Sequence, residues 1–180
     1  MDGKLEGFWS YACSLYAKSG IESQLLLLQN DHGLVINHVL LACWLSSERV
    51  SINWCSLLSS ENSSGLVSDL IEPMRAFRIA QKSSVPETLY SSLKRLELDL
   101  ENQHIQWLEV FAQRSSESDG KEPKLSLDTA GIGLLEQNLT AYLEAIISEG
   151  RFPEGFDRAS CDSALKAFIS SVEGWLVSGN

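Results

Sequence analysis

The chain has 180 residues, of which 44% are hydrophobic and 21% are charged, a composition that excludes a disordered chain and a collagen-like fibre. The formal net charge of −10 disfavours nucleic acid as a partner, because phosphates repel an acidic surface. No uncharged stretch is long enough for a membrane span. The four cysteines show no C-x-x-C spacing and the N-terminus has no signal-peptide core, so we expect a cytoplasmic protein.

The hydrophobic spacing predicts an all-α, multi-helix bundle without strands or internal repeats. The first helix is expected over about residues 6–18 and the second over about 21–32. Four consecutive leucines in the second helix point in different directions, so this helix should be mostly enclosed. The third helix, about 35–47, is apolar nearly all round, which is typical of a helix in the middle of a bundle.

Ser51 is a suitable cap for a short fourth helix, and residues 61–65, ENSSG, are expected to form a turn. The fifth helix is expected over about residues 66–82, where Pro73 should kink it or mark a boundary. Its core stripe is predicted to consist of Leu66, Leu70, Met74 and Phe77.

The sixth helix, about residues 86–114, is the longest. Its apolar residues follow the alternating spacing of a coiled-coil seam: Leu89, Leu93, Leu96, Leu100, Trp107 and Val110. Because such a stripe is too long to stay in contact with water, we expect it to pack against the two C-terminal helices or against a second copy of itself. A homo-oligomer through residues 86–114 is therefore one expectation.

Two C-terminal helices complete the chain, one over about residues 128–149 and one that begins near Ser160. Residues 115–127, SSESDGKEPKLSL, are polar and charged and are expected to form a flexible linker. We therefore expect an N-terminal five-helix bundle over residues 1–84. Residues 85–180 would then hold the long helix and the two C-terminal helices.

Short motifs follow one another in the N-terminal half: Phe8-Trp9, Leu15-Tyr16, Gly20, Leu26 with Leu28-Gln29, Gly33, Ile36-Asn37 and Cys43-Trp44-Leu45. Their order resembles an uncharacterised family of small helical proteobacterial proteins, whose pattern reads FW, LY, G, LxLQ, HG, VN and CxWL. The resemblance covers about residues 8–80, and Asn30 stands where the family often has Asp. It implies a bacterial cytoplasmic helical protein and no established activity.

Gln29, His32 and Asn37 are polar residues at the apolar sides of the second and third helices. An unsatisfied buried polar group costs about 1–3 kcal/mol, so these side chains need partners. One interpretation is that they bond the backbone at the turn between the two helices. The alternative is a small-ligand pocket that these three residues line together with Trp9, Tyr16 and Trp44.

Arg75, Arg78 and Lys82 fall on one side of the fifth helix and form a basic stripe in an acidic protein. One interpretation is a solvated face with partial ion pairing. The other is a docking site for an acidic partner, since arginine can bind carboxylates with two parallel hydrogen bonds.

Glu101 and His104 form an E-x-x-H motif like those of di-iron bundles, which need a second such motif. Neither His32 nor His38 has a glutamate three residues before it, so we expect no metal and no cofactor. The sequence also has no known catalytic motif. The leading interpretation is a non-enzymatic interaction protein, adaptor or regulatory subunit. The alternative is a ligand-binding or enzymatic bundle with its pocket near Gln29, His32 and Asn37.

Overall fold

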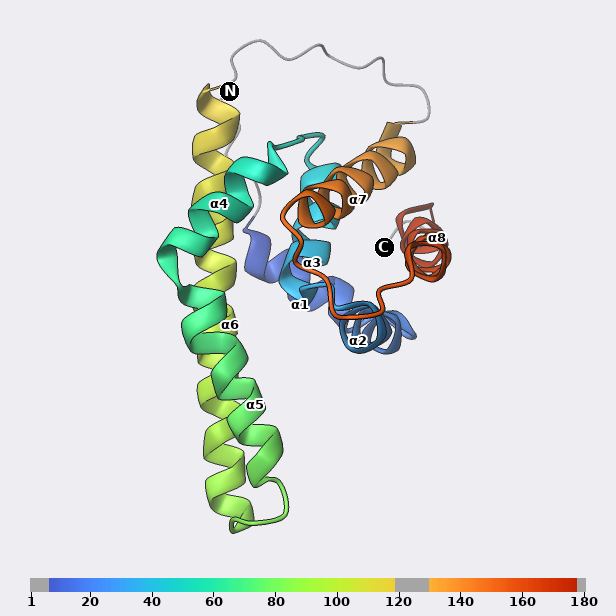
Figure 1. The fold of residues 1–180 in the computed structure, drawn as a ribbon. Helices are drawn as coiled ribbons and strands as arrows, with labels where there is room; N and C mark the ends of the chain where they lie inside the picture. Colours follow the sequence, from blue (N-terminus) through green and yellow to red (C-terminus); the bar gives the residue numbers. More distant parts are fainter. Residues whose placement is uncertain (1–6, 119–129, 178–180) are drawn as a thin grey trace.

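The computed structural model describes residues 7–118 and 130–177. Within these ranges every regular element is a helix, which confirms the all-α fold class (Figure 1). In chain order the elements are α1 (Phe8–Tyr16), α2 (Ile21–His32), α3 (Ile36–Ser47), α4 (Trp54–Ser64), the π-helix η1 (Leu66–Ile71), α5 (Glu72–Gln81), α6 (Glu87–Ser118), α7 (Ala130–Ser148) and α8 (Arg158–Val177). The expected long helix is α6, and the two expected C-terminal helices are α7 and α8.

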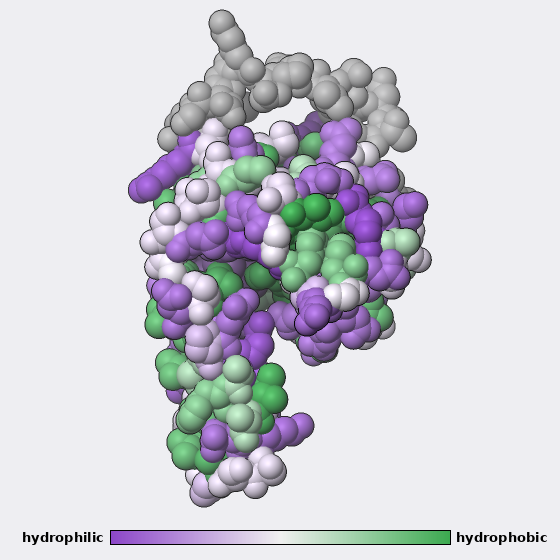
Figure 2. All heavy atoms as spheres, viewed as in Figure 1, coloured by the Kyte–Doolittle hydropathy of each residue, from purple (hydrophilic) through white to green (hydrophobic). Residues whose placement is uncertain are grey.

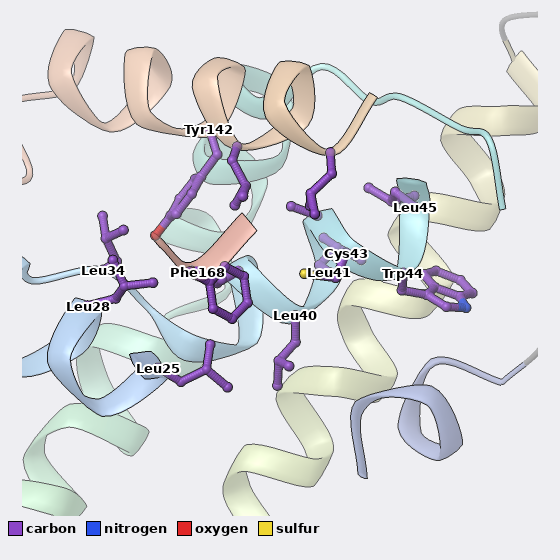
Figure 3. Close-up of a cluster of buried hydrophobic side chains, with 14 of the residues drawn as sticks. Leu25, Leu28, Leu34, Leu40, Leu41, Cys43, Trp44, Leu45, Tyr142 and Phe168 are labelled. Carbon is purple, nitrogen blue, oxygen red and sulfur yellow. The ribbon is translucent and has the colours of Figure 1, made fainter. Parts of the chain in front are cut away.

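Helix α3 lies at the centre of the core, as its apolar sequence predicts. Every residue from Asn37 to Ser46 is buried. Helices α1, α2, α6 and α7 pack around it. The indole of Trp44 stacks on the ring of Phe8 with their centroids 5.2 Å apart. Figure 3 shows Phe168 of α8 and Tyr142 of α7 reaching the leucines of α2 and α3. This burial places the side chains from Asn37 to Ser46, polar ones included, among other side chains.

The C-terminal helices complete the same core. Helix α8 packs against α2, and α7 packs against α3 and α4. The buried apolar side chains of α7 and α8 belong to one cluster with those of α1 to α4 and α6. The hydrophobic core therefore crosses the expected division between residues 1–84 and residues 85–180.

Helices α5 and α6 form a hairpin that projects from the rest of the molecule (Figure 1). The change from the π-helix η1 to α5 occurs next to Pro73, which stands in the first turn of α5. Because the residues before it are already helical, Pro73 lacks an N–H group that would continue the hydrogen-bond pattern of η1. The expectation that Pro73 marks a boundary agrees with this change of helix type.

The expected core stripe of the fifth helix is wrong for Leu70 and Phe77, and its other two residues, Leu66 and Met74, are only half-buried. Leu70 and Phe77 are 51% and 52% exposed, whereas Arg75 and Arg78 face α6 and bind its carboxylates. A π-turn holds more residues than an α-turn, so the six residues of η1 rotate the following helix relative to an uninterrupted α-helix. The rotation turns the arginine side of α5, instead of the apolar side, toward α6.

The expectation that the leucine seam of α6 contacts α7 and α8 is also wrong. Helix α6 packs on α1, α3, η1 and α5, and Leu89, Leu96 and Val110 of the seam are exposed. Its buried side includes the polar residues Glu97 and His104, which have partners on other helices. These polar contacts fix the rotation of α6. Pairing of the seam with a second copy stays a prediction.

Helix α6 continues to Ser118, so residues 115–118 of the expected linker are helical. The remaining linker residues, 119–127, lie outside the described residues. Among the helices that the structure describes, none combines the length and the low polarity that a membrane crossing requires.

Candidate functional site: a buried carboxylate between two histidines

Glu61 is a buried residue of α4, and the expected turn at ENSSG is wrong for its first four residues. The helix begins after Asn53, whose side chain accepts a hydrogen bond from the Ser56 N–H at 3.0 Å, and it continues to Ser64. Glu61 comes seven residues after Trp54, so the two share the inward side of α4. The helical spacing that places Trp54 in the core thus also places the carboxylate there.

The Glu61 carboxylate lies between two imidazoles. Its Oε1 atom is 2.7 Å from Nε2 of His38 on α3 and 2.6 Å from Nε2 of His104 on α6. Glu61 is 2% exposed, His38 is 0% exposed and His104 is 1% exposed. We call His38, Glu61 and His104 the His–Glu–His cluster. The potential ligand atoms of these residues, one from each, all lie within 4.8 Å of one another.

The outer nitrogen of each imidazole has a partner that can donate. Nδ1 of His38 lies 3.3 Å from the Tyr142 hydroxyl, which accepts a hydrogen bond from the Val35 N–H at 3.1 Å. Nδ1 of His104 lies 3.1 Å from Nδ2 of Asn37. If the hydroxyl and the amide donate to Nδ1, each imidazole is neutral and carries its proton on Nε2. Both Nε2–H groups then donate to Glu61.

Arg151 supplies a positive charge on the other side of Glu61. Its Nη1 atom is 3.5 Å from Oε2 of Glu61, while its Nε atom binds Glu149 at 2.7 Å. Burial alone would raise the pKa of Glu61, but His38 and His104 outweigh this effect and hold the pKa well below its usual range. Burial lowers the pKa of His104. The cluster therefore holds a carboxylate anion and a neutral His104 at neutral pH.

A cavity of about 560 Å³ lies beside the cluster, with Asn37 and His104 in its wall. It brings together four of the six residues predicted to line a pocket: Trp9, Tyr16, Gln29 and Asn37. His32 is buried at the end of α2 and is not among its lining residues, and Trp44 lies in the core against Phe8. A second cavity, of about 290 Å³, has His38, Glu61 and Arg151 in its wall.

Two cations of the predicted basic stripe bind carboxylates of α6. Arg75 binds Glu97 at 3.1 Å and also binds Glu101, and Arg78 binds Glu97. Lys82 is exposed beyond the end of α5. A partner protein would have to compete with Glu97 and Glu101 for both guanidinium groups. Glu101 of the E-x-x-H motif therefore binds Arg75, and the carboxylate that binds His104 comes from α4.

Residues 7–108 match the family DUF2390, which is described as a protein of unknown function. The chain belongs to this family. No curated protein and no solved structure is significantly similar to it. The DUF2390 region runs from α1 into α6 and contains all of the His–Glu–His cluster together with Asn37. Tyr142 and Arg151 lie outside this region, although their side chains contact the cluster.

Proposed function

We propose that this DUF2390 protein binds a small molecule in the 560 Å³ cavity between α1, α2, α3, η1, α5 and α6. The observation that carries the proposal is that Asn37 and His104, bonded to each other at 3.1 Å, connect the cavity wall to the buried carboxylate of Glu61. Buried titratable groups beside a cavity are typical of functional sites, because removing such groups from water costs stability and a purely structural role seldom explains them. Cavities of this size are typical of sites for small molecules.

The residues of the cavity wall favour a neutral or cationic amphipathic ligand. Apolar side chains line much of it, and Trp9 and Tyr16 offer aromatic faces that attract cations. Two arginines and three glutamates give the wall an excess of one negative charge: Arg75, Arg78, Glu72, Glu97 and Glu101. Both arginines are already paired with Glu97 or Glu101. An anionic ligand would therefore meet few free positive charges.

The two exposed cysteines provide a matched test of this proposal. Cys13 lines the cavity, whereas Cys55 does not. A panel of small metabolites would be screened by thermal shift, and we expect a ligand that slows alkylation of Cys13 but not of Cys55. Cys13→Trp should fill the cavity and abolish the shift, while Cys55→Trp should preserve it. A ligand that protects both thiols equally, or that still binds Cys13→Trp, would contradict the proposal.

A second candidate function, protein interaction, is favoured by the apolar side of the α5–α6 hairpin. Leu70 and Phe77 project from η1 and α5, and Leu89 and Leu96 project from α6, each about half exposed. Figure 2 shows apolar residues gathered at this projecting end of the molecule. Leu89 and Leu96 are seven residues apart, a spacing that suits pairing with another long helix. We propose a second copy of the chain as the partner, so that two hairpins pair side by side.

Two leucines of α6 test this pairing. Leu96 and Leu98 are 48% and 54% exposed but point to opposite sides of the helix. Mass in solution, measured by light scattering over a range of concentrations, should show a dimer for the wild type and for Leu98→Asp. Leu96→Asp should be a monomer with an unchanged melting temperature. A wild-type monomer at every concentration rules out the dimer.

A further inference from the structure

The spacing of histidines and glutamates along the sequence leads us to expect no metal, but the fold brings together three ligands that are far apart in the sequence, and we propose that the His–Glu–His cluster binds one divalent transition-metal ion. The proposal is independent of the ligand proposed for the cavity. Two imidazole nitrogens and one carboxylate oxygen are a donor set that Zn²⁺ and other first-row ions accept, with further positions open to water or substrate. The three residues come from α3, α4 and α6, so the fold itself brings the donors together.

The donor atoms already converge. Nε2 of His38 and Nε2 of His104 are 2.7 and 2.6 Å from the same oxygen of Glu61. Around a four-coordinate ion with bonds of about 2.0–2.1 Å, donor atoms lie roughly 3.3 Å apart. Each N···O distance would therefore lengthen by about 0.6–0.7 Å when the ion enters. Small rotations of these three side chains are enough for such a change.

The outer partners of the imidazoles suit a metal-bound state as well as the metal-free one. An ion would take the lone pair of each Nε2, so the imidazole proton would move to Nδ1 and the ring would stay neutral. Nδ1–H of His38 would then donate to the Tyr142 oxygen, which lies 3.3 Å away. The Asn37 amide, after a half-turn, would present its oxygen to Nδ1–H of His104. Outer hydrogen bonds of this kind orient the histidines of metal sites.

The surroundings supply both access and an opposing charge. Both cavities reach the cluster, one through His104 and the other through His38 and Glu61. The Trp54 indole ring lies 6.2 Å from the His38 ring, and its buried Nε1 atom has no hydrogen-bond partner among the described residues. Arg151 opposes a cation, since its guanidinium is 3.5 Å from Oε2 of Glu61. We therefore expect Arg151 to weaken metal binding.

The test is a titration of the full-length, untagged, chelator-treated protein with Co²⁺, followed by visible absorption and by the melting temperature. We expect one Co²⁺ per chain, displaced by Zn²⁺, and a higher melting temperature with metal. Glu61→Gln and His104→Gln remove ligands, so they should weaken binding by at least the roughly 10–100-fold that the loss of an outer partner costs. Glu97→Gln and His32→Gln make the same changes at buried residues outside the cluster and should leave binding unchanged.

Two results would overturn the proposal: a folded wild-type protein without a cobalt spectrum, or binding that persists unchanged in Glu61→Gln and His104→Gln. Should these variants not fold, Arg151→Gln decides the question. It should bind Co²⁺ more tightly than the wild type, because the opposing charge is gone, and unchanged or weaker binding would contradict the site. Cys13→Trp, which fills the cavity, should bind cobalt as the wild type does.

Discussion

At the scale of single residues, the most unusual feature is a carboxylate that is 2% exposed and shares one oxygen between two imidazoles. Removing such groups from water is costly, and their mutual attraction offsets this cost only when each polar atom has a partner. Here Tyr142 and Asn37 bond the outer nitrogens, and Arg151 lies near the second oxygen of Glu61. The cluster is therefore held by partners from several helices at once.

Tyr142 links this cluster to the start of α3, so Tyr142→Phe should lower the free energy of unfolding by about 1–3 kcal/mol. The substitution keeps the ring but leaves the Val35 N–H and Nδ1 of His38 without the hydroxyl that both contact. Urea denaturation would measure the loss. An unchanged midpoint and slope would show that water or another group replaces the hydroxyl at no cost.

Gly33 joins α2 to α3 with a positive φ of 71°, and a Cβ atom there would lie 2.8 Å from Cδ of Pro153. Gly20 has a φ of 84° but open space around it, so it is a matched control. Gly20→Ala should cost about 1–2 kcal/mol of stability from backbone strain. Gly33→Ala should cost more, because the clash is added. If both variants lose the same amount of stability in thermal denaturation, the loop between α7 and α8 that contains Pro153 moves aside at no cost.

Part of this site could be predicted from the sequence and part could not. Asn37 stands out because it is polar on an apolar helix, and the structure places it in the cavity wall and against His104. Glu61 escapes notice when ENSSG is taken as a turn, although its seven-residue distance from Trp54 is the signal that could have found it. The meeting of Glu61 with His38 and His104 depends on how α3, α4 and α6 pack, and no local pattern encodes it.

At the scale of helices, the α5–α6 hairpin is held together by charged groups. Arg75 and Arg78 bind Glu97, which is 7% exposed, and this contact turns the leucines of α6 outward.

The positions of the helices along the sequence follow from hydrophobic spacing, and most of the expected helices are present. The rotation of α5 and α6 could not be predicted in the same way. It depends on ion pairs between helices and on the π-helix η1, whereas hydrophobic spacing assumes that the most apolar side faces inward.

Glu97→Gln should destabilise the hairpin by about 1.5–3 kcal/mol at neutral pH, the range for hydrogen bonds to charged groups. Burial alone would raise the pKa of Glu97, but Arg78 and Arg75 outweigh it and lower the pKa. A lowered pKa in the folded state means that the stabilisation is present above the unfolded pKa of about 4.3 and is lost as the pH falls through the folded value. The stabilities of wild type and variant should therefore differ at pH 7 and converge in acid. If the stabilities of wild type and variant differ by the same amount at pH 7 and in acid, the contact between Glu97 and the arginines is not ionic.

At the scale of the whole molecule, the core is shared between segments that lie far apart in the sequence. The DUF2390 match ends at residue 108, yet α7 and α8 bury large side chains against α2, α3 and α4. Phe168 of α8 and Tyr142 of α7 are among the largest fully buried side chains. Without these two helices the apolar residues of α2 and α3 would meet water. Residues 7–108 therefore do not contain all the side chains of the core to which they contribute.

The dependence of the N-terminal helices on α7 and α8 can be measured by cutting the chain. A protease site introduced between residues 119 and 129 should yield two pieces that stay associated and melt together, because the shared core holds them. Residues 1–118 alone should lack a cooperative transition, since about 25 cal/mol of stabilisation is lost for each Å² of apolar surface returned to water. Phe168→Ala in the intact chain should cost about 3–5 kcal/mol for the same reason. A cooperative transition of the isolated 1–118 piece at the wild-type temperature would show that the N-terminal helices form an independent core.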